Sequence, residues 1–68
     1  MMLQIFINGE QQEVSAGTTL ARLIEGRRLS GKRLAVEVNE EIVPRSYLNE
    51  YQLQQGDRIE IVQAIGGG

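Results

Sequence analysis

The sequence contains no cysteine, no histidine and no tryptophan. Without cysteine, neither a disulfide framework nor a thiolate metal site can supplement the core. His-based triads, cysteine nucleophiles and the common zinc sites are likewise excluded. The neighbouring carboxylates of Glu40 and Glu41 remain, but they stand in a polar turn and are interpreted as solvated charges. The sequence therefore predicts a protein that is not an enzyme and that binds neither a metal nor a cofactor itself.

Long apolar runs and an excess of positive charge are also missing. The N-terminal stretch MMLQIFINGE has no basic residue and is interrupted by Gln4 and Asn8, which argues against a signal peptide or a membrane span and favours a cytoplasmic protein. The net charge of -2 and the pI near 5.0 disfavour nucleic-acid binding. One basic cluster is present and is expected to be a solvated loop: Arg27, Arg28, Lys32 and Arg33.

The residues that are present suffice for a single small globular domain. The chain has 68 residues, of which 41% are hydrophobic and 24% charged. A domain of this size buries only about 60% of the surface of its unfolded chain, so the core must be small. We expect the domain to span residues 1–65 and a flexible glycine tail to span residues 66–68.

The first half of the chain has the pattern of a hairpin followed by a helix. Apolar residues alternate with others over residues 2–7, which predicts a strand with one face in the core. Asn8-Gly9 predicts a type I′ turn into a second strand over residues 10–15. After a break at Ala16-Gly17, Thr18 or Thr19 can cap a short helix that ends near Gly26.

The second half contains three further strands. The pattern predicts one over residues 34–38, a turn over 39–41 and a brief strand beginning at Ile42 and Val43, which Pro44 ends or confines to a sheet edge. An irregular or single-turn segment with Tyr47, Leu48, Tyr51 and Leu53 follows. Gly56-Asp57 then turns the chain into a last strand over residues 58–65.

This order predicts the fold class α+β, as a mixed sheet of about five strands with one main helix on one face. The two most apolar strands are the first and the last. Burying both requires them to lie side by side, in parallel, at the centre of the sheet, and the helical crossover must be right-handed. That arrangement is the ubiquitin-like β-grasp fold.

Three glycines, Gly66, Gly67 and Gly68, follow the last predicted strand directly. They have no side chains and reach roughly 10 Å. A frayed terminus is one interpretation. The other is that the tail threads into the narrow active site of a partner, where the carboxylate of Gly68 reacts after activation by that enzyme.

Four segments are informative together: INGE at residues 7–10, TLARLIE at 19–25, AVEVNEEIVPR at 35–45 and GDRIEIVQAIGGG at 56–68. They resemble the ThiS family of sulfur carriers in thiamine biosynthesis, over essentially the whole chain. The last two segments are the specific ones. In the family, the two glycines that match Gly67 and Gly68 often follow a residue other than glycine, so Gly66 is an addition here.

The resemblance implies a cycle of sulfur transfer. A ThiF-type adenylyltransferase, using ATP and Mg, would adenylate Gly68, and sulfur from a persulfide donor would then convert it to a thiocarboxylate. A ThiG-type thiazole synthase would receive that sulfur for the thiazole ring. No nucleic acid or membrane partner is implied.

Two alternatives stay open. One is a MoaD-like small subunit of molybdopterin synthase, which has the same fold and also ends in Gly-Gly. The other is a non-catalytic TGS-like β-grasp domain that binds RNA or a regulator, which would need a basic or aromatic sheet face.

A partner-binding patch is expected on the sheet face opposite the helix. If alternate residues of the first strand face the helix, then Phe6 faces out, as do Val62 and Ala64 on the last strand. We expect these three residues to form an apolar patch that leads toward the tail.

Overall fold

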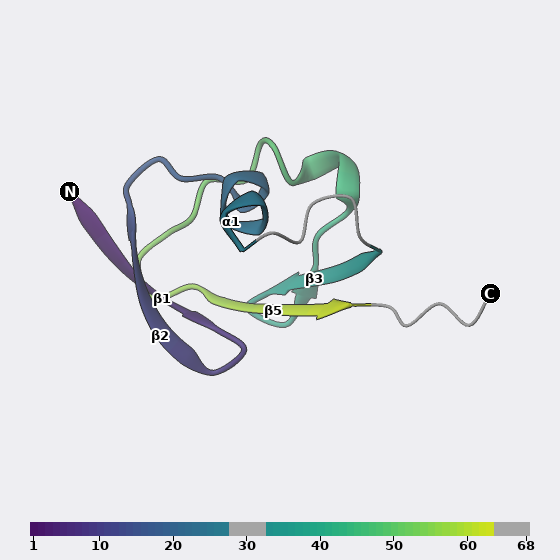
Figure 1. The fold of residues 1–68 in the computed structure, drawn as a ribbon, viewed down its shortest axis with the longest axis horizontal. Helices are drawn as coiled ribbons and strands as arrows, with labels where there is room; N and C mark the ends of the chain where they lie inside the picture. Colours follow the sequence, from purple (N-terminus) through teal and green to yellow (C-terminus); the bar gives the residue numbers. More distant parts are fainter. Residues whose placement is uncertain (28–32, 64–68) are drawn as a thin grey trace.

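The chain forms a five-stranded mixed sheet with one helix on one face, as Figure 1 shows. The computed structural model describes residues 1–27 and 33–63. The elements are β1 (Met2–Ile7), β2 (Glu10–Ser15), α1 (Leu20–Gly26), β3 (Leu34–Val38), β4 (Glu41–Ile42), the 3-10 helix η1 (Arg45–Tyr47) and β5 (Arg58–Gln63). The strand order is β2-β1-β5-β3-β4. Since β5 lies in the centre and runs parallel to β1, the predicted β-grasp layout is confirmed.

The β1–β2 hairpin forms as its turn sequence predicts. Asn8 and Gly9 both have positive φ, at 49° and 85°, as a type I′ turn requires. The antiparallel register runs from Met2 opposite Ser15 to Ile7 opposite Glu10. It places Ile5 and Ile7 in the core and leaves Gln4 exposed on the other face.

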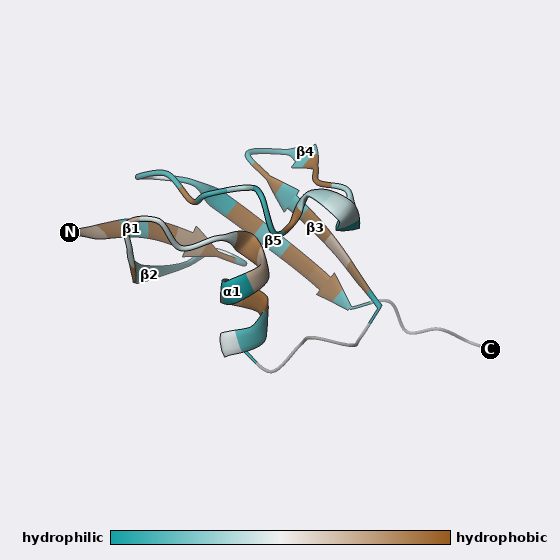
Figure 2. Ribbon diagram, turned by 90° about the horizontal axis from the view of Figure 1, so that it is seen from above, coloured by the Kyte–Doolittle hydropathy of each residue, from teal (hydrophilic) through white to brown (hydrophobic). Residues whose placement is uncertain are grey.

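The core lies between the sheet and α1. Figure 2 shows that hydrophobic residues concentrate on the central strands β1, β5 and β3. Each fully buried isoleucine or leucine stabilises the fold by about 1.5–3 kcal/mol. The buried hydrophobic residues are Ile5, Ile7, Leu20, Leu23, Ile24, Val36, Val38, Leu53, Ile59 and Ile61.

Helix α1 is short and depends on neighbours for its N-terminal hydrogen bonds. Thr19 is the N-cap, and its hydroxyl oxygen accepts a hydrogen bond from the backbone N–H of Arg22 at 3.2 Å. The N–H groups of Leu20 and Ala21 donate to the carbonyls of Tyr51 and Leu48, both at 3.0 Å. The segment after η1 therefore satisfies donors that the first helical turn leaves unpaired.

The fourth strand lies one residue earlier than the sequence predicts. It comprises Glu41–Ile42 rather than beginning at Ile42 and Val43. The reason is a tight turn, in which Asn39 and Glu40 both adopt positive φ, at 52° and 71°. The prediction of a three-residue turn was therefore wrong. Glu40 adopts a positive φ, which is uncommon for a glutamate, and β4 consequently begins at Glu41. At the other end, residues 64 and 65 of the predicted last strand lie outside the described residues.

Candidate functional site

The candidate site is the C-terminal end of β5 and the sheet face beside it. β5 continues beyond the end of β1, because Phe6 and Ile7 pair with Arg58 and Ile59 at its beginning. On its other side, β3 pairs with it as far as Gln63. Figure 1 shows the β5 arrow pointing away from the end of the molecule where the N-terminus lies. Four predicted site residues lie outside the described part of the chain: Ala64, Gly66, Gly67 and Gly68.

A buried carboxylate fixes the start of β5. Asp57 is only 4% exposed and accepts three hydrogen bonds. The donors are Asn39 Nδ2 at 3.0 Å, the Tyr51 hydroxyl at 2.9 Å and the Gln54 backbone N–H at 2.9 Å. Because a buried carboxylate is costly unless its oxygens are satisfied, this cluster determines where the strand begins.

The pKa of Tyr51 is raised by burial and by its contact with Asp57. Partial burial of the phenol, followed in importance by its hydrogen bond to Asp57, raises the pKa of Tyr51 to about 12. The neutral phenol donates the hydrogen bond, so Tyr51 acts as a structural donor. The sequence showed Asp57 only as a turn residue, and its burial depends on partners that local patterns cannot reveal. An acidic residue directly before an apolar strand is the one available signal.

The sheet face opposite α1, called the outer face below, carries Phe6 and Val62, two of the three expected docking residues, and these two lie apart. Val62 is 60% exposed and pairs with Ala35 on β3. Phe6 lies on the same face but is half-buried, and it stands beside Arg58. Four residues of β5, or roughly 13 Å, therefore separate Phe6 from Val62 along the strand. The parallel register places Phe6 at the start of β5, so Phe6 and Val62 are not contiguous, and the docking role of the predicted patch stays a prediction.

Two glutamates lie between these apolar residues. Glu37 on β3 and Glu60 on β5 are direct cross-strand partners. Like charges in directly opposite positions are destabilising. Their negative charge also repels phosphate, so this face does not fit the RNA-binding alternative.

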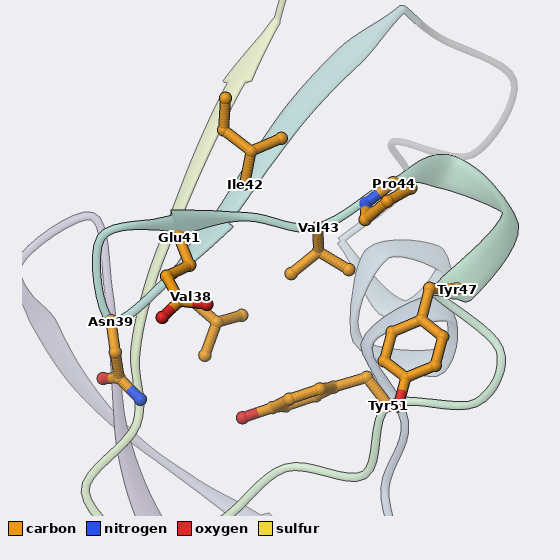
Figure 3. Close-up of a pocket in the computed structure, with 8 residues that line it drawn as sticks. All are labelled: Val38, Asn39, Glu41, Ile42, Val43, Pro44, Tyr47 and Tyr51. Carbon is orange, nitrogen blue, oxygen red and sulfur yellow. The ribbon is translucent and has the colours of Figure 1, made fainter.

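A hollow lies beside β4, and Figure 3 shows its lining. Val43 and Tyr51 point into it, whereas Ile42 points away and is 75% exposed. The Tyr47 and Tyr51 rings meet edge to face with centroids 6.5 Å apart. Among the lining residues, Glu41 is the single carboxylate, so the hollow offers no pair of carboxylates.

Within residues 1–27 and 33–63, no three acidic side chains gather closely enough to hold a metal ion. Neither helix in this part of the chain is long and apolar enough to cross a membrane.

Comparison with known proteins identifies relatives over nearly the whole chain. The model of the ThiS family matches residues 5–68. The sulfur carrier protein ThiS of Escherichia coli K12 is 37% identical over 68 residues, which covers 97% of this chain and 100% of that protein. A crystal structure of the thiamine biosynthesis protein ThiS from Geobacter metallireducens has a TM-score of 0.82, at 22% identity and with 97% and 100% of the two chains covered. That structure supports the same fold.

Two longer proteins contain a similar segment. The thiazole synthases of Magnetococcus marinus and Paramagnetospirillum magneticum are 41% and 39% identical to this chain over 66 residues. In each case the match covers 97% of this chain and 20% of the relative. The chain thus spans about a fifth of the length of these two relatives.

Proposed function

Because this chain belongs to the ThiS family, we propose that it is a sulfur carrier protein of thiamine biosynthesis, acting as a substrate of partner enzymes rather than as an enzyme. The observation that carries the proposal is the extent of the family match, which continues through the glycine tail to Gly68. The central position of β5 supports it, since this strand is held on both sides and leads toward that tail.

The chemistry takes place at the carboxylate of Gly68 in a chain that ends there. A carboxylate is a poor electrophile, so a ThiF-type adenylyltransferase must first activate it. A carboxylate oxygen attacks the α-phosphorus of ATP, with Mg bound by the enzyme, and pyrophosphate leaves. The terminal sulfur of a persulfide donor then attacks the acyl carbon and displaces AMP. A thiol reductant cleaves the resulting S–S bond and leaves the thiocarboxylate.

The sulfur acceptor that fits is a ThiG-type thiazole synthase. Two proteins of that name contain a segment similar to almost the whole of this chain. A carrier domain within the same polypeptide has a high effective concentration for its acceptor. We propose that the separate chain delivers its sulfur to the same kind of enzyme.

Docking uses the outer face of the sheet near the end of β5. Val62 is the exposed apolar residue of this region, and Ala35 lies beside it. The predicted Ala64 would extend this group toward the tail, whereas Phe6 would contact a partner at the far end of the face. A partner enzyme that binds this region aligns the glycine tail with the catalytic groups of the enzyme.

The proposal is tested by adenylation. The 68-residue chain is incubated with a ThiF-type enzyme, ATP and labelled pyrophosphate, and exchange of label into ATP is measured. We expect exchange that depends on the chain and is absent with a matched chain whose Gly68 carboxylate is blocked as the amide. Equal exchange with the amidated chain would falsify the assignment of Gly68.

Transfer is tested next. Adding thiazole synthase and its other substrates to the thiocarboxylate form should regenerate the carboxylate form, measured by intact mass. A thiocarboxylate that persists through thiazole formation would exclude thiazole synthase as the acceptor.

A further inference from the structure

The side chain of Asn8 holds the backbone of β5 at two points. Its amide oxygen Oδ1 accepts a hydrogen bond from the N–H of Ile61 at 2.9 Å. Its amide nitrogen Nδ2 donates to the carbonyl of the same residue at 3.3 Å. One side chain in the β1–β2 turn thus satisfies both polar backbone groups of a residue 53 positions later in the sequence.

These two bonds continue the parallel ladder after β1 has ended. The ladder begins with the N–H of Phe6 donating to Asp57 and continues with the N–H of Asn8 donating to Ile59, both at 2.9 Å. In a regular parallel pair, Ile61 would next donate to the main-chain carbonyl of Asn8 and accept from the residue two positions later. The chain has by then turned into the hairpin, so the Asn8 amide takes the place of both peptide groups.

Asparagine is the residue that meets both demands of this position. The backbone has a φ of 49°, which asparagine tolerates better than most residues. Aspartate tolerates the same conformation, but an ionised carboxylate has no donor for the Ile61 carbonyl. Glycine forms the turn readily and has no side chain to offer. The asparagine of the turn sequence therefore has a second role that a hairpin alone does not require.

Asn39 makes an analogous contact at the opposite end of β5. It has a φ of 52°, its N–H donates to the Arg58 carbonyl at 2.8 Å and its Oδ1 accepts from the Arg58 N–H at 3.0 Å. Both turn asparagines therefore bind β5 through their side chains. Asn39 holds the first residue of the strand, whereas Asn8 holds Ile61, which lies three residues nearer to the tail.

We propose that Asn8 is a positioning residue for the reactive tail, acting through Ile61. The inference deepens the proposed carrier function and rests on it. Beyond Ile59, the Asn8 side chain is hydrogen-bonded to the edge of β5 that faces β1, and β3 pairs with the other edge as far as Gln63. Hydrogen bonds on both edges fix the backbone direction of the end of β5. Without the Asn8 amide, β3 alone holds this end, and a partner must order it when the carrier docks.

The expected effect is a rise in the KM of the carrier for adenylation. Ordering the backbone of one residue corresponds to about a tenfold change in an equilibrium constant. We therefore expect Asn8→Gly to raise KM about tenfold and to leave kcat unchanged, because the docked complex restores the strand. Asn8→Asp keeps the acceptor for the Ile61 N–H and is expected to give an intermediate KM.

The matched control is Asn39→Gly. Both substitutions preserve the positive φ of a turn and remove a side chain that binds β5, but Asn39 lies at the end remote from the tail. We expect Asn39→Gly to lower the melting temperature without raising KM more than about twofold. If KM rises in both variants in proportion to their loss of melting temperature, Asn8 has only a structural role and the proposal is overturned.

Amide hydrogen exchange tests the contact without any partner enzyme. In Asn8→Gly, the Ile61 amide should lose its protection while the Arg58 amide keeps it, and in Asn39→Gly the reverse is expected. Unchanged protection of Ile61 in Asn8→Gly would overturn the proposal even if adenylation of the wild-type chain succeeds. A wild-type chain that is never adenylated would instead overturn the carrier function, and the exchange result would still stand for the Asn8 contact.

Discussion

The cluster around Asp57 should contribute measurably to stability, and Tyr51→Phe is the mildest way to perturb it. The substitution removes the hydroxyl that donates to Asp57 at 2.9 Å and keeps the ring. A hydrogen bond to a charged group contributes about 1.5–3 kcal/mol, and Tyr51 is only partly buried, so the lower value applies. For a domain of this size, a loss of about 1.5 kcal/mol lowers the melting temperature by about 6–12 °C.

Asp57→Asn is the stronger perturbation. All three partners of the carboxylate are donors, and the amide of asparagine would bring a fourth donor into the same buried position. We expect a loss of about 3 kcal/mol, a large part of the total stability of so small a domain. The double variant with Tyr51→Phe should lose less than the sum of the single variants, because both remove the same hydrogen bond.

Thermal unfolding followed by circular dichroism measures these effects, with Tyr47→Phe as the matched control. Tyr47 is 47% exposed, and phenylalanine preserves the edge contact with the Tyr51 ring. The melting temperature of the Tyr47→Phe variant should therefore equal that of the wild type. If Tyr51→Phe lowers the melting temperature by less than about 2 °C, the contribution assigned to this hydrogen bond is refuted.

The raised pKa of Tyr51, caused by burial and by the hydrogen bond to Asp57, predicts that stability depends on pH. The pKa of Tyr51 rises from 10.0 to about 12 on folding, so the folded state favours the protonated phenol. The associated stability is fully present below pH 10 and is lost as the pH rises toward 12. Tyr51→Phe should remove this loss, as measured by denaturant unfolding across that range. An identical decline in wild type and variant would assign it to other groups.

Three further predictions concern the tail and the outer face. Gly67→Val should abolish adenylation at an unchanged melting temperature, because its side chain obstructs a narrow partner channel while the buried residues of the described chain end at Ile61; normal adenylation would contradict threading. Val62→Ser should raise the KM for adenylation without lowering the melting temperature, because Val62 is exposed. Phe6→Ser, at a half-buried position, should lower the melting temperature. A raised KM with an unchanged melting temperature in Phe6→Ser, and not in Val62→Ser, would move the docking site to the start of β5. Glu60→Gln should stabilise the fold by about 0.2–1 kcal/mol by relieving repulsion from Glu37, with a smaller gain at high salt; a loss of stability would mean that the pair is not repulsive.

Local patterns predicted most of the fold. Strand alternation and the Asn8-Gly9 turn depend on residues close in sequence, and both appear where the sequence places them. The helix cap is Thr19, one of the two candidates, Thr18 and Thr19, that the sequence offered. The central pairing of β1 and β5 also followed, because it buries the two most apolar strands. The position of β4 was missed by one residue, since nothing local indicates that Glu40 adopts positive φ.

The site was less predictable because it depends on long-range register. The sequence indicated correctly that Phe6 and Val62 share the outer face, but their separation follows from which residue of β5 stands opposite β1. The roles of Asn8 and Asp57 were missed for the same reason. Their partners include Ile61, 53 residues away from Asn8, and Asn39, 18 residues away from Asp57. Turn propensity explains the presence of such residues without revealing these contacts.

The central claim is that Gly68 carries sulfur as a thiocarboxylate. The most direct measurement is the mass of the C-terminal peptide after the chain has been incubated with a ThiF-type enzyme, ATP, Mg and a persulfide donor. We predict an increase equal to the replacement of one oxygen by sulfur, located on Gly68 and absent when ATP is omitted. An unmodified C-terminal peptide from a competent enzyme, or sulfur located at any other residue, would contradict the account.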